Sequence, residues 1–329
     1  MELYAGDTWY PNDILTKCIT TEKLNCAGSL EFGVTSNFAP ILEDKKIITL
    51  TDGEETVFRG RVLSAARKTA GEMSVLCEGE LAFFNDSIIY GRLRGDFDDV
   101  FSSLIELHNT KTDTWQHIEE GDVDGFDASH TFGESGKSMR TMEMLQSIVA
   151  LEPNRFLLFE NDEDNNRVLS FYSMEHPLYI NQQEIVFGEN LISFRRERRF
   201  DDIVTRVYAY GTTQEGEHIK LDNPVDADPD AIARYGIIAK RIDVNADSTA
   251  ELTQLARSAL CTQHSENIEI EAFDRHWIDK SIPRFRPRAV VVKSPPDGFT
   301  GTVIIREVRQ DWLNPGKNTI KIGTTRKIV

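Results

Sequence analysis

Apolar and polar side chains alternate regularly between Ile203 and Tyr210. Successive side chains of a strand point to opposite faces. One face of this strand would therefore carry the smaller side chains, and the other would carry both apolar and polar ones. The small face comprises Ile203, Thr205, Val207 and Ala209, and the amphipathic face comprises Val204, Arg206, Tyr208 and Tyr210. β-Branched and aromatic residues suit a half-buried sheet surface, and Gly211 marks an end. The pattern predicts a strand over 203–210.

Residues 1–94 carry shorter alternating segments. One passes through Ile48 and Leu50 to an Asp52-Gly53 turn, and the alternation resumes at Val57. Such segments recur about every ten residues and are joined by Gly and Asp turns, which is typical of a sandwich or a small barrel.

Helical spacing then replaces alternation. Phe97 and Leu104 belong to the apolar face of one expected helix, and acidic residues stand in its first turn. A second apolar stripe, from Met139 to Val149, predicts another helix. The segment 155–174 places two apolar runs around a polar turn, as in a hairpin. Residues 95–190 are therefore predicted to form an α+β lobe.

The C-terminal half returns to β signals after one more helix. Ser248 and Glu251 have the spacing of a capping box, and an apolar helical stripe follows them. Later strands are expected at 290–292, 302–308 and 319–322. We expect the strand 203–210 to lie with these later strands, which makes residues 214–282 an insertion.

The net charge of the chain disfavours some classes of function. The 329 residues include 54 acidic and 37 basic side chains, for a net charge of −17. This excess of acid disfavours phosphate-driven nucleic-acid binding as the main function. No apolar run approaches the roughly 18 residues of a membrane helix, and the N-terminus lacks the features of an export signal. We expect no stable membrane association and synthesis in the cytosol.

Four cysteines, Cys18, Cys26, Cys77 and Cys261, are spread along the chain without a Cys-x-x-Cys pair. Their low density argues against a disulfide scaffold. Reduced and mostly buried thiols are expected.

Four arginines stand within five residues immediately before the strand 203–210. They are Arg195, Arg196, Arg198 and Arg199, with Glu197 between them. They cannot all be buried without partners, so they are expected on an exposed edge or in an interface. Two interpretations stay open: a solvated charged run that discourages edge-to-edge strand pairing, and an ion-pair site between subunits.

The motif GESGKS, residues 133–138, resembles a phosphate-binding loop because it precedes a helix. The nucleotide-binding pattern requires a glycine where this chain has Thr131, and no apolar core strand comes before it. We instead expect Gly136 to turn the chain and Ser138 to cap the helix.

Metal and catalytic motifs fail similar tests. Asp162, Asp164 and Asn166 imitate the start of a calcium loop, but Arg167 occupies the position that requires glycine. A second acidic segment, Asp226, Asp228 and Asp230, fails the same test because Ala231 occupies that position. Cys261 and His264 are three residues apart yet lack a second pair of ligands. No Gly-x-Ser-x-Gly elbow is present. We expect surface turns, no catalytic residue, no cofactor and no metal, which favours a structural or assembly role by elimination.

Three segments carry a resemblance to a known family. They are LEFGVTSNFAPILEDKKIITLTDGEETVFRGRV, NLISFRRERRFDDIVTRVYAYGTT and GTVIIREVRQDWLNPGKNTIKIG. In style and order they resemble phage and prophage tail proteins of the endopeptidase-tail, or tail-associated-lysin, class, which are similar to the baseplate hub of contractile tails.

The resemblance implies a β-rich α+β multi-domain fold with two tube-type β-barrels and two smaller α+β lobes. The expected domains are 1–94 for the first barrel, 95–190 for the first lobe, 191–213 with 283–329 for the second barrel, and 214–282 for the inserted lobe. Three copies would form a ring of six similar barrels.

The implied function is that of a structural, non-enzymatic hub at the virion tail tip, assembled in the host cytoplasm. The homotrimer would join tail-tube ring proteins to a fibre or spike, with DNA only passing through its channel. The arginine run would face acidic surface on a neighbouring subunit or ring. Because the chain stops after the last expected barrel strand, the lytic activity in the family name is not carried over.

Two other classes remain as alternatives. One is a cell-wall-degrading tail endopeptidase or hydrolase whose site is assembled from distant residues. The other is a carbohydrate-binding module that uses exposed tryptophans, for which the candidates are Trp9, Trp115, Trp277 and Trp312.

Overall fold

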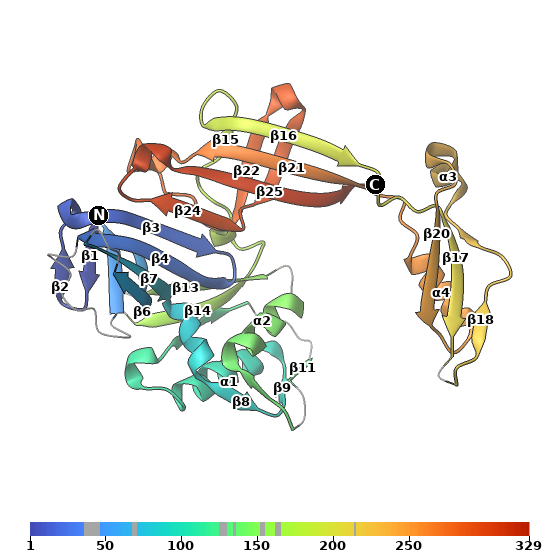
Figure 1. Cartoon of the computed structure of the whole chain (residues 1–329), viewed down its shortest axis with the longest axis horizontal. Helices are drawn as coiled ribbons and strands as arrows, with labels where there is room; N and C mark the ends of the chain where they lie inside the picture. Colours follow the sequence, from blue (N-terminus) through green and yellow to red (C-terminus); the bar gives the residue numbers. More distant parts are fainter. Residues whose placement is uncertain are drawn as a thin grey trace. The chain divides into compact units, whose positions relative to one another are not determined.

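The computed structural model describes residues 1–35, 47–67, 71–124, 130–133, 136–151, 155–161, 166–213 and 215–328. The chain divides into two compact units. Unit 1 comprises Met1–Ile192 and Glu271–Ile322, and unit 2 comprises Ser193–Ile270 and Gly323–Val329. Figure 1 colours the chain along its sequence and labels the elements. The chain is β-rich, with one sheet shaped as a half-barrel and several smaller sheets.

The half-barrel of unit 1 is an eight-stranded sheet in the order β2-β1-β5-β6-β7-β4-β3-β24. Its strands are β1 (Glu2–Ala5), β2 (Thr8–Tyr10), β3 (Leu15–Lys23), β4 (Cys26–Thr35), β5 (Ile47–Asp52), β6 (Glu55–Arg67), β7 (Glu72–Gly79) and β24 (Glu307–Asp311). The predicted alternation is visible in β5, where Ile48 and Leu50 are fully buried. These side chains join Tyr10 and Phe32 in one core cluster.

The strand β24 places a C-terminal segment in the sheet of the N-terminal strands, as Figure 1 shows with β24 in red beside blue β3. It pairs with β3 from Glu307 opposite Lys23 to Asp311 opposite Ile19. The following Trp312 is buried in the same core and donates a 2.9 Å hydrogen bond to Thr20 Oγ1. The sequence prediction puts this segment in a second barrel, and the observed pairing corrects the position of that strand.

Both helices and the hairpin predicted within residues 95–190 are present in unit 1. The helices are α1 (Phe97–Asn109) and α2 (Thr141–Leu151), and the sheet runs β10 (Glu119–Val123), β14 (Arg167–Ser173), β13 (Arg155–Asn161). Two short antiparallel pairs adjoin it: β8 (Ile88–Tyr90) with β12 (Ser138–Arg140), and β9 (Leu93–Gly95) with β11 (His130–Phe132).

The sequence explains how the lobe is fixed. Asp96 caps α1 by accepting a 3.0 Å hydrogen bond from the Asp99 N–H, as Asp commonly does at helix starts. The apolar face of α1 then meets the sheet, and the rings of Phe97 and Phe171 stack with centroids 4.6 Å apart. Aromatic burial of this kind provides a large share of the stability of a small core.

Two three-stranded sheets complete the later part of the chain. One is β15 (Ile185–Val186), β22 (Ala289–Ser294), β23 (Phe299–Ile304), and the other is β16 (Leu191–Arg199), β21 (His264–Phe273), β25 (Thr319–Ile328). In the second sheet β21 is central, so β16 and β25 are edge strands. The division between the two units falls within these three strands.

Unit 2 is built around β17 (Arg206–Thr212). The predicted alternation is confirmed, because Ile203, Thr205, Val207 and Ala209 are buried while Tyr208 and Tyr210 are exposed. The other elements are β18 (His218–Lys220), β19 (Val225–Asp226), α3 (Pro229–Tyr235), β20 (Ala239–Asn245) and α4 (Thr249–Ser258). Val207 and Ala209 pack in one cluster with Leu252 and Ala256 of α4.

The expected partners of this strand were wrong. β17 pairs with β18 and β19 in antiparallel fashion and with β20 in parallel, and all three come from the segment expected to be an insertion. Alternation shows which side chains of a strand are buried but not which strands lie beside it, and nearby segments close with less loss of chain entropy. The capping box of α4 is confirmed, since Ser248 Oγ accepts from the Glu251 N–H at 3.2 Å and Glu251 accepts from the Asp247 N–H at 2.9 Å.

Candidate functional site

The arginine run forms an extended strand. All four arginines lie in β16, an edge strand, so the run is itself a β element that the sequence prediction missed. Arg195 contacts Glu269 of β21, and Arg196 and Arg198 contact Glu266 of the same strand. Alternating opposite charges are a usual way to stabilise neighbouring strands.

The arginines of β16 have carboxylate partners within unit 2. Arg196 Nε lies 2.5 Å from Glu266 Oε1 and Arg198 Nε lies 3.5 Å from the same oxygen. The Arg195 guanidinium lies 3.3 Å from Glu269. Arg199 pairs with Asp201, whose carboxylate raises the pKa of the Arg199 guanidinium.

Burial separates the four arginines into two kinds. The Glu266 side chain is 0% exposed and Arg196 is 24% exposed, whereas Arg195, Arg198 and Arg199 are 65%, 58% and 49% exposed. A buried carboxylate needs its cation, while exposed ion pairs contribute little to stability. Arg196 therefore has an internal structural role, and each of the other three keeps about half of its surface or more for outside contacts.

A second arginine cluster lies in unit 1 at the end of β3. Arg284 is 2% exposed and contacts Glu22, and its Nε lies 3.2 Å from Glu55 Oε1. Arg286 contacts the same two carboxylates. Burial acts to raise the pKa of Glu22, but the neighbouring arginines, Arg284 foremost, outweigh it and hold that pKa below its ordinary value. Both carboxylates thus bridge the same two guanidinium groups.

Glu80, at the start of the 3-10 helix η2 (Glu80–Asp86), forms a third buried ion-pair group. It contacts Arg167, and Arg59 Nε lies 3.3 Å from its Oε1. Its second oxygen is buried and has no hydrogen-bond partner among the described residues. Burial raises the pKa of the Glu80 carboxyl in spite of the two arginines.

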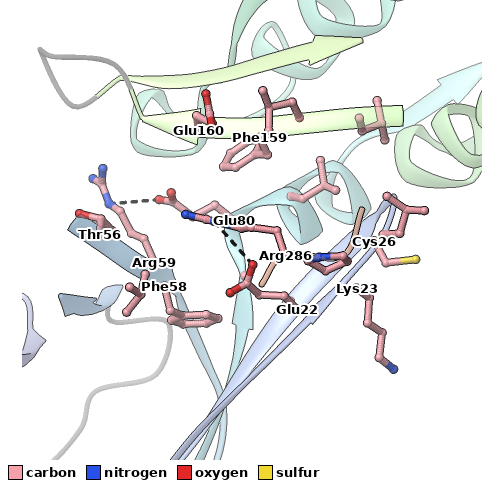
Figure 2. Close-up of a pocket in the computed structure, with 18 of the residues that line it drawn as sticks. Glu22, Lys23, Cys26, Thr56, Phe58, Arg59, Glu80, Phe159, Glu160 and Arg286 are labelled. Carbon is pink, nitrogen blue, oxygen red and sulfur yellow. Dashed lines mark ion pairs between the residues drawn. The ribbon is translucent and has the colours of Figure 1, made fainter. Parts of the chain in front are cut away.

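A cleft of about 690 Å³ in unit 1 is lined by Glu22, Glu55 and Arg286 of the second group and by Arg59 and Glu80 of the third. Figure 2 shows Phe159 and Glu160 of β13 on one side of it, and Glu22, Lys23 and Cys26 on the other. The dashed lines join Arg59 to Glu80 and Arg286 to Glu22. The lining is mixed, with guanidinium and carboxylate groups beside apolar side chains from β6 and β13.

Among the described residues, no three His, Cys, Asp or Glu side chains cluster as a metal site would require. Cys261 and His264 do not converge on a shared site, because the Cys261 thiol contacts the Gln263 carbonyl oxygen at 3.5 Å. The structure describes four free thiols, of which Cys18 and Cys77 are buried, and burial raises the pKa of Cys18 to about 12. Such thiols are poor nucleophiles at neutral pH.

The acidic turns after β18 have structural roles. Asp226 pairs with Arg206 at 2.6 Å, and Asp228 caps α3 by accepting from the Ala231 N–H at 2.8 Å. Both residues are exposed as expected, but Asp226 lies in β19 and Asp228 precedes α3, so they do not form a simple surface turn. In the other calcium-like turn, Asp162 and Asp164 lie outside the described residues.

The glycine-rich segment before α2 agrees with expectation only in part. Gly136 has a φ of 76°, a conformation that favours glycine, and it turns the chain as expected. Ser138 lies in β12 and α2 begins at Thr141, so the expected Ser138 cap was wrong. Glu143 instead accepts a 3.0 Å hydrogen bond from the Arg140 N–H.

The tryptophan candidates do not form one exposed surface. Trp312 is buried, and its ring meets that of Trp277 edge-to-face with centroids 5.1 Å apart. Trp9 is exposed on β2, and Trp115 contacts Phe83. Half of the set therefore belongs to the half-barrel core or packs against it.

Comparison with solved structures finds matches that span the chain. A prophage tail protein, gp18 from Listeria monocytogenes EGD-e, aligns over 100% of this chain and 94% of its own with a TM-score of 0.53 and 12% identity. The 43 kDa tail protein of prophage MuSo2 from Shewanella oneidensis aligns over 99% and 97% with a TM-score of 0.57 and 14% identity. The resemblance to phage and prophage tail proteins is thereby confirmed at the level of fold.

A third similar structure is the Escherichia coli c3393 protein, described as a type VI secretion component with structural similarity to the T4 tail proteins gp27 and gp5. It aligns over 100% of this chain and 77% of its own, with a TM-score of 0.52 and 8% identity. No protein-family model and no curated protein matches the sequence. None of the helices in the described ranges is long and apolar enough to cross a membrane.

Proposed function

We propose that this protein is a structural baseplate hub or tail-tip protein of a phage or prophage tail. Three copies would form a ring that joins the tail tube to a fibre or spike. The observation that carries the proposal is the end-to-end structural match to prophage tail proteins and to a protein described as similar to T4 gp27 and gp5. Partners would be the tail-tube ring proteins, and the location would be the virion tail tip.

The sheets of the chain suit this role. The half-barrel leaves β2 and β24 as edge strands, and the sheet of β16, β21 and β25 has two edges of its own. Open edges are liabilities unless another chain or a covering element satisfies them. In the proposed ring each sheet belongs to one tube-type barrel, so each subunit contributes two, and DNA passes through an acidic channel without stable binding.

The exposed arginines of β16 are proposed as subunit contacts. Arg195, Arg198 and Arg199 would reach acidic surface on a neighbouring subunit or ring, where guanidinium and carboxylate groups form directional hydrogen bonds. The net charge of −17 supplies that acidic surface. Arg196 has a separate role, because it holds buried Glu266 within its own chain.

The first experiment is light scattering after size exclusion across a range of protein concentrations. A particle near three times 37.4 kDa supports the ring, and a monomer at every concentration, alone and with tube and fibre proteins, contradicts it. The triple variant R195S/R198S/R199S should lower the oligomer fraction while unit 2 stays folded. Arg257→Ser, on the exposed side of α4, is the matched control. A zymogram on bacterial cell wall, with and without chelator, tests the hydrolase alternative.

A further inference from the structure

The strand β13 has one unpaired edge in unit 1, apart from the surfaces proposed for the ring. In the described sheet β13 pairs only with β14. The Leu157 N–H donates to Asn25 Oδ1 at 2.8 Å, so the main chain of Leu157 points away from β14. Because main-chain groups alternate between the two edges of a strand, those of Phe159 and Asn161 also point away from β14. An edge of this kind is a template for another strand.

Asn25 limits how much of this edge is open. It lies at the tip of the β3–β4 hairpin with a φ of 58°, a conformation that Asn tolerates better than most residues. Its side chain occupies the edge at Leu157, where a partner strand would otherwise bind. The open part of β13 therefore begins at Phe159, which lines the cleft of Figure 2.

Two buried acceptor atoms lie on residues that line the same cleft. Glu80 Oε2 and Asn161 Oδ1 are both inaccessible to solvent, and neither has a hydrogen-bond partner among the described residues. A buried polar atom without a partner is costly, so a hydrogen-bond donor that reached these atoms would be stabilising. The main-chain N–H groups of a peptide are donors of this type.

One guanidinium of the cleft, that of Arg288, differs from the others in its ion pairing. Glu22, Glu55 and Glu80 each contact two arginines, whereas Arg288 forms no ion pair among the described residues. Arg288 Nη1 donates a hydrogen bond to the Leu178 carbonyl oxygen at 2.7 Å, and the guanidinium lies 5.9 Å from the centre of the Phe156 ring. Burial, and then repulsion from Arg286, lowers the pKa of Arg288, because together they outweigh the attraction of the Glu160 and Glu22 carboxylates. An anion beside Arg288 would offset both effects.

We propose that this cleft binds an extended polypeptide segment of a partner protein, which adds to the open edge of β13 and places a carboxylate side chain against Arg288. The main-chain groups of Phe159 and Asn161 provide the strand pairing. The lone guanidinium of Arg288 selects an acidic segment over a basic one. The apolar side chains of β13 and β6 line the remaining surface. This binding requires no ring and is separate from the β16 contacts.

The test uses a defined probe, the capped pentapeptide Thr-Val-Glu-Val-Thr, with the same peptide carrying Lys in place of Glu as control. In protein labelled with ¹⁵N at Phe and Asn, the acidic peptide should shift the amide signals of Phe159 and Asn161, while the signal of buried Phe32 stays unchanged. It should also slow alkylation of exposed Cys26, which lines the cleft. We expect the Lys peptide to bind about tenfold more weakly, as loss of a charge-assisted hydrogen bond predicts.

Variants separate the charge from the fold. In Arg288→Gln the ratio of the affinities for the Glu peptide and the Lys peptide should fall to about one. Arg288→Lys should retain most of the preference for the Glu peptide. Arg309→Gln, at an exposed arginine of β24, should change nothing. Thermal unfolding of each variant checks that unit 1 is intact. Equal binding of both peptides, or shifts that spare Phe159 and Asn161, would overturn the proposal. So would protection of Cys26 by inorganic phosphate alone, since that result would indicate a simple anion site.

Discussion

The arginine groups around Arg284 in unit 1 and along β16 in unit 2 differ in burial, and burial decides what each can do. In unit 1, Arg284 is 2% exposed and contacts Glu22 and Glu55. In unit 2, three of the four arginines of β16 are about half exposed or more. A buried guanidinium is needed by the carboxylates of its own chain. An exposed one can bind a partner in place of water with little effect on the free energy of unfolding.

Arg196 connects the two cases. It belongs to the exposed strand by sequence, but its partner Glu266 is fully buried. A run of like residues is therefore not one functional unit. Arg198 contacts the same carboxylate as Arg196, but its side chain is 58% exposed against 24% for Arg196. The function proposed for the run belongs to Arg195, Arg198 and Arg199.

The largest effect is expected from Arg284→Ala. The change removes the buried cation and leaves Glu22 and Glu55 with Arg286 alone, whose side chain is 36% exposed, so it should lower the free energy of unfolding by about 3–5 kcal/mol. Chemical denaturation followed by tryptophan fluorescence measures it, because Trp312 lies in the adjoining core. A loss below about 1 kcal/mol would mean that the buried pairs contribute no more than surface pairs do.

Arg196→Ala should come next. It removes the nearest cation from Glu266, and we expect a loss of about 3 kcal/mol, partly limited by Arg198 at 3.5 Å. The double variant R196M/E266L should recover most of this loss, because an apolar pair of similar volume leaves no charge buried. If the double variant is no more stable than Arg196→Ala, packing and not charge explains the effect.

The sequence predicted local structure better than long-range contacts. The buried face of β17 and the capping box at Ser248 both follow from neighbouring residues, and both were confirmed. The pairing of β24 with β3 joins segments almost 290 residues apart, and the contact of Arg284 with Glu22 joins residues 262 apart. No local pattern records such contacts, since many charged residues are equally suitable partners until the fold brings two of them together.

The pH dependence should distinguish two buried carboxyls. The folded pKa of Glu22 lies below its ordinary value of about 4.3, so its stabilisation is present above that pH and is lost as pH falls through the folded pKa. The folded pKa of Glu80 is raised, so its contribution is present at low pH and is lost as pH rises through the folded pKa.

Opposite trends follow for the two amide variants. The loss of stability in Glu22→Gln should grow from pH 4 to pH 7, while the loss in Glu80→Gln should shrink over the same range. Urea denaturation at three or four pH values measures both. Glu31→Gln, which removes the carboxylate of the surface pair with Lys17, controls for loss of a negative charge. Parallel trends for Glu22→Gln and Glu80→Gln would contradict the assigned difference.

The smallest effect on folding is expected from Arg195→Ala, and it gives the sharpest contrast with Arg284→Ala. Its side chain is 65% exposed and its partner Glu269 is 62% exposed, so the free energy of unfolding should change by less than about 0.5 kcal/mol. If Arg195 faces an acidic neighbour, the same change should nevertheless weaken association, and added salt should weaken association of the unaltered protein more than that of the variant. Light scattering at low and high salt, with denaturation in parallel, separates the two quantities. A variant that unfolds readily would make Arg195 a structural residue like Arg196, and one that assembles with unchanged salt dependence would remove Arg195 from the proposed contact.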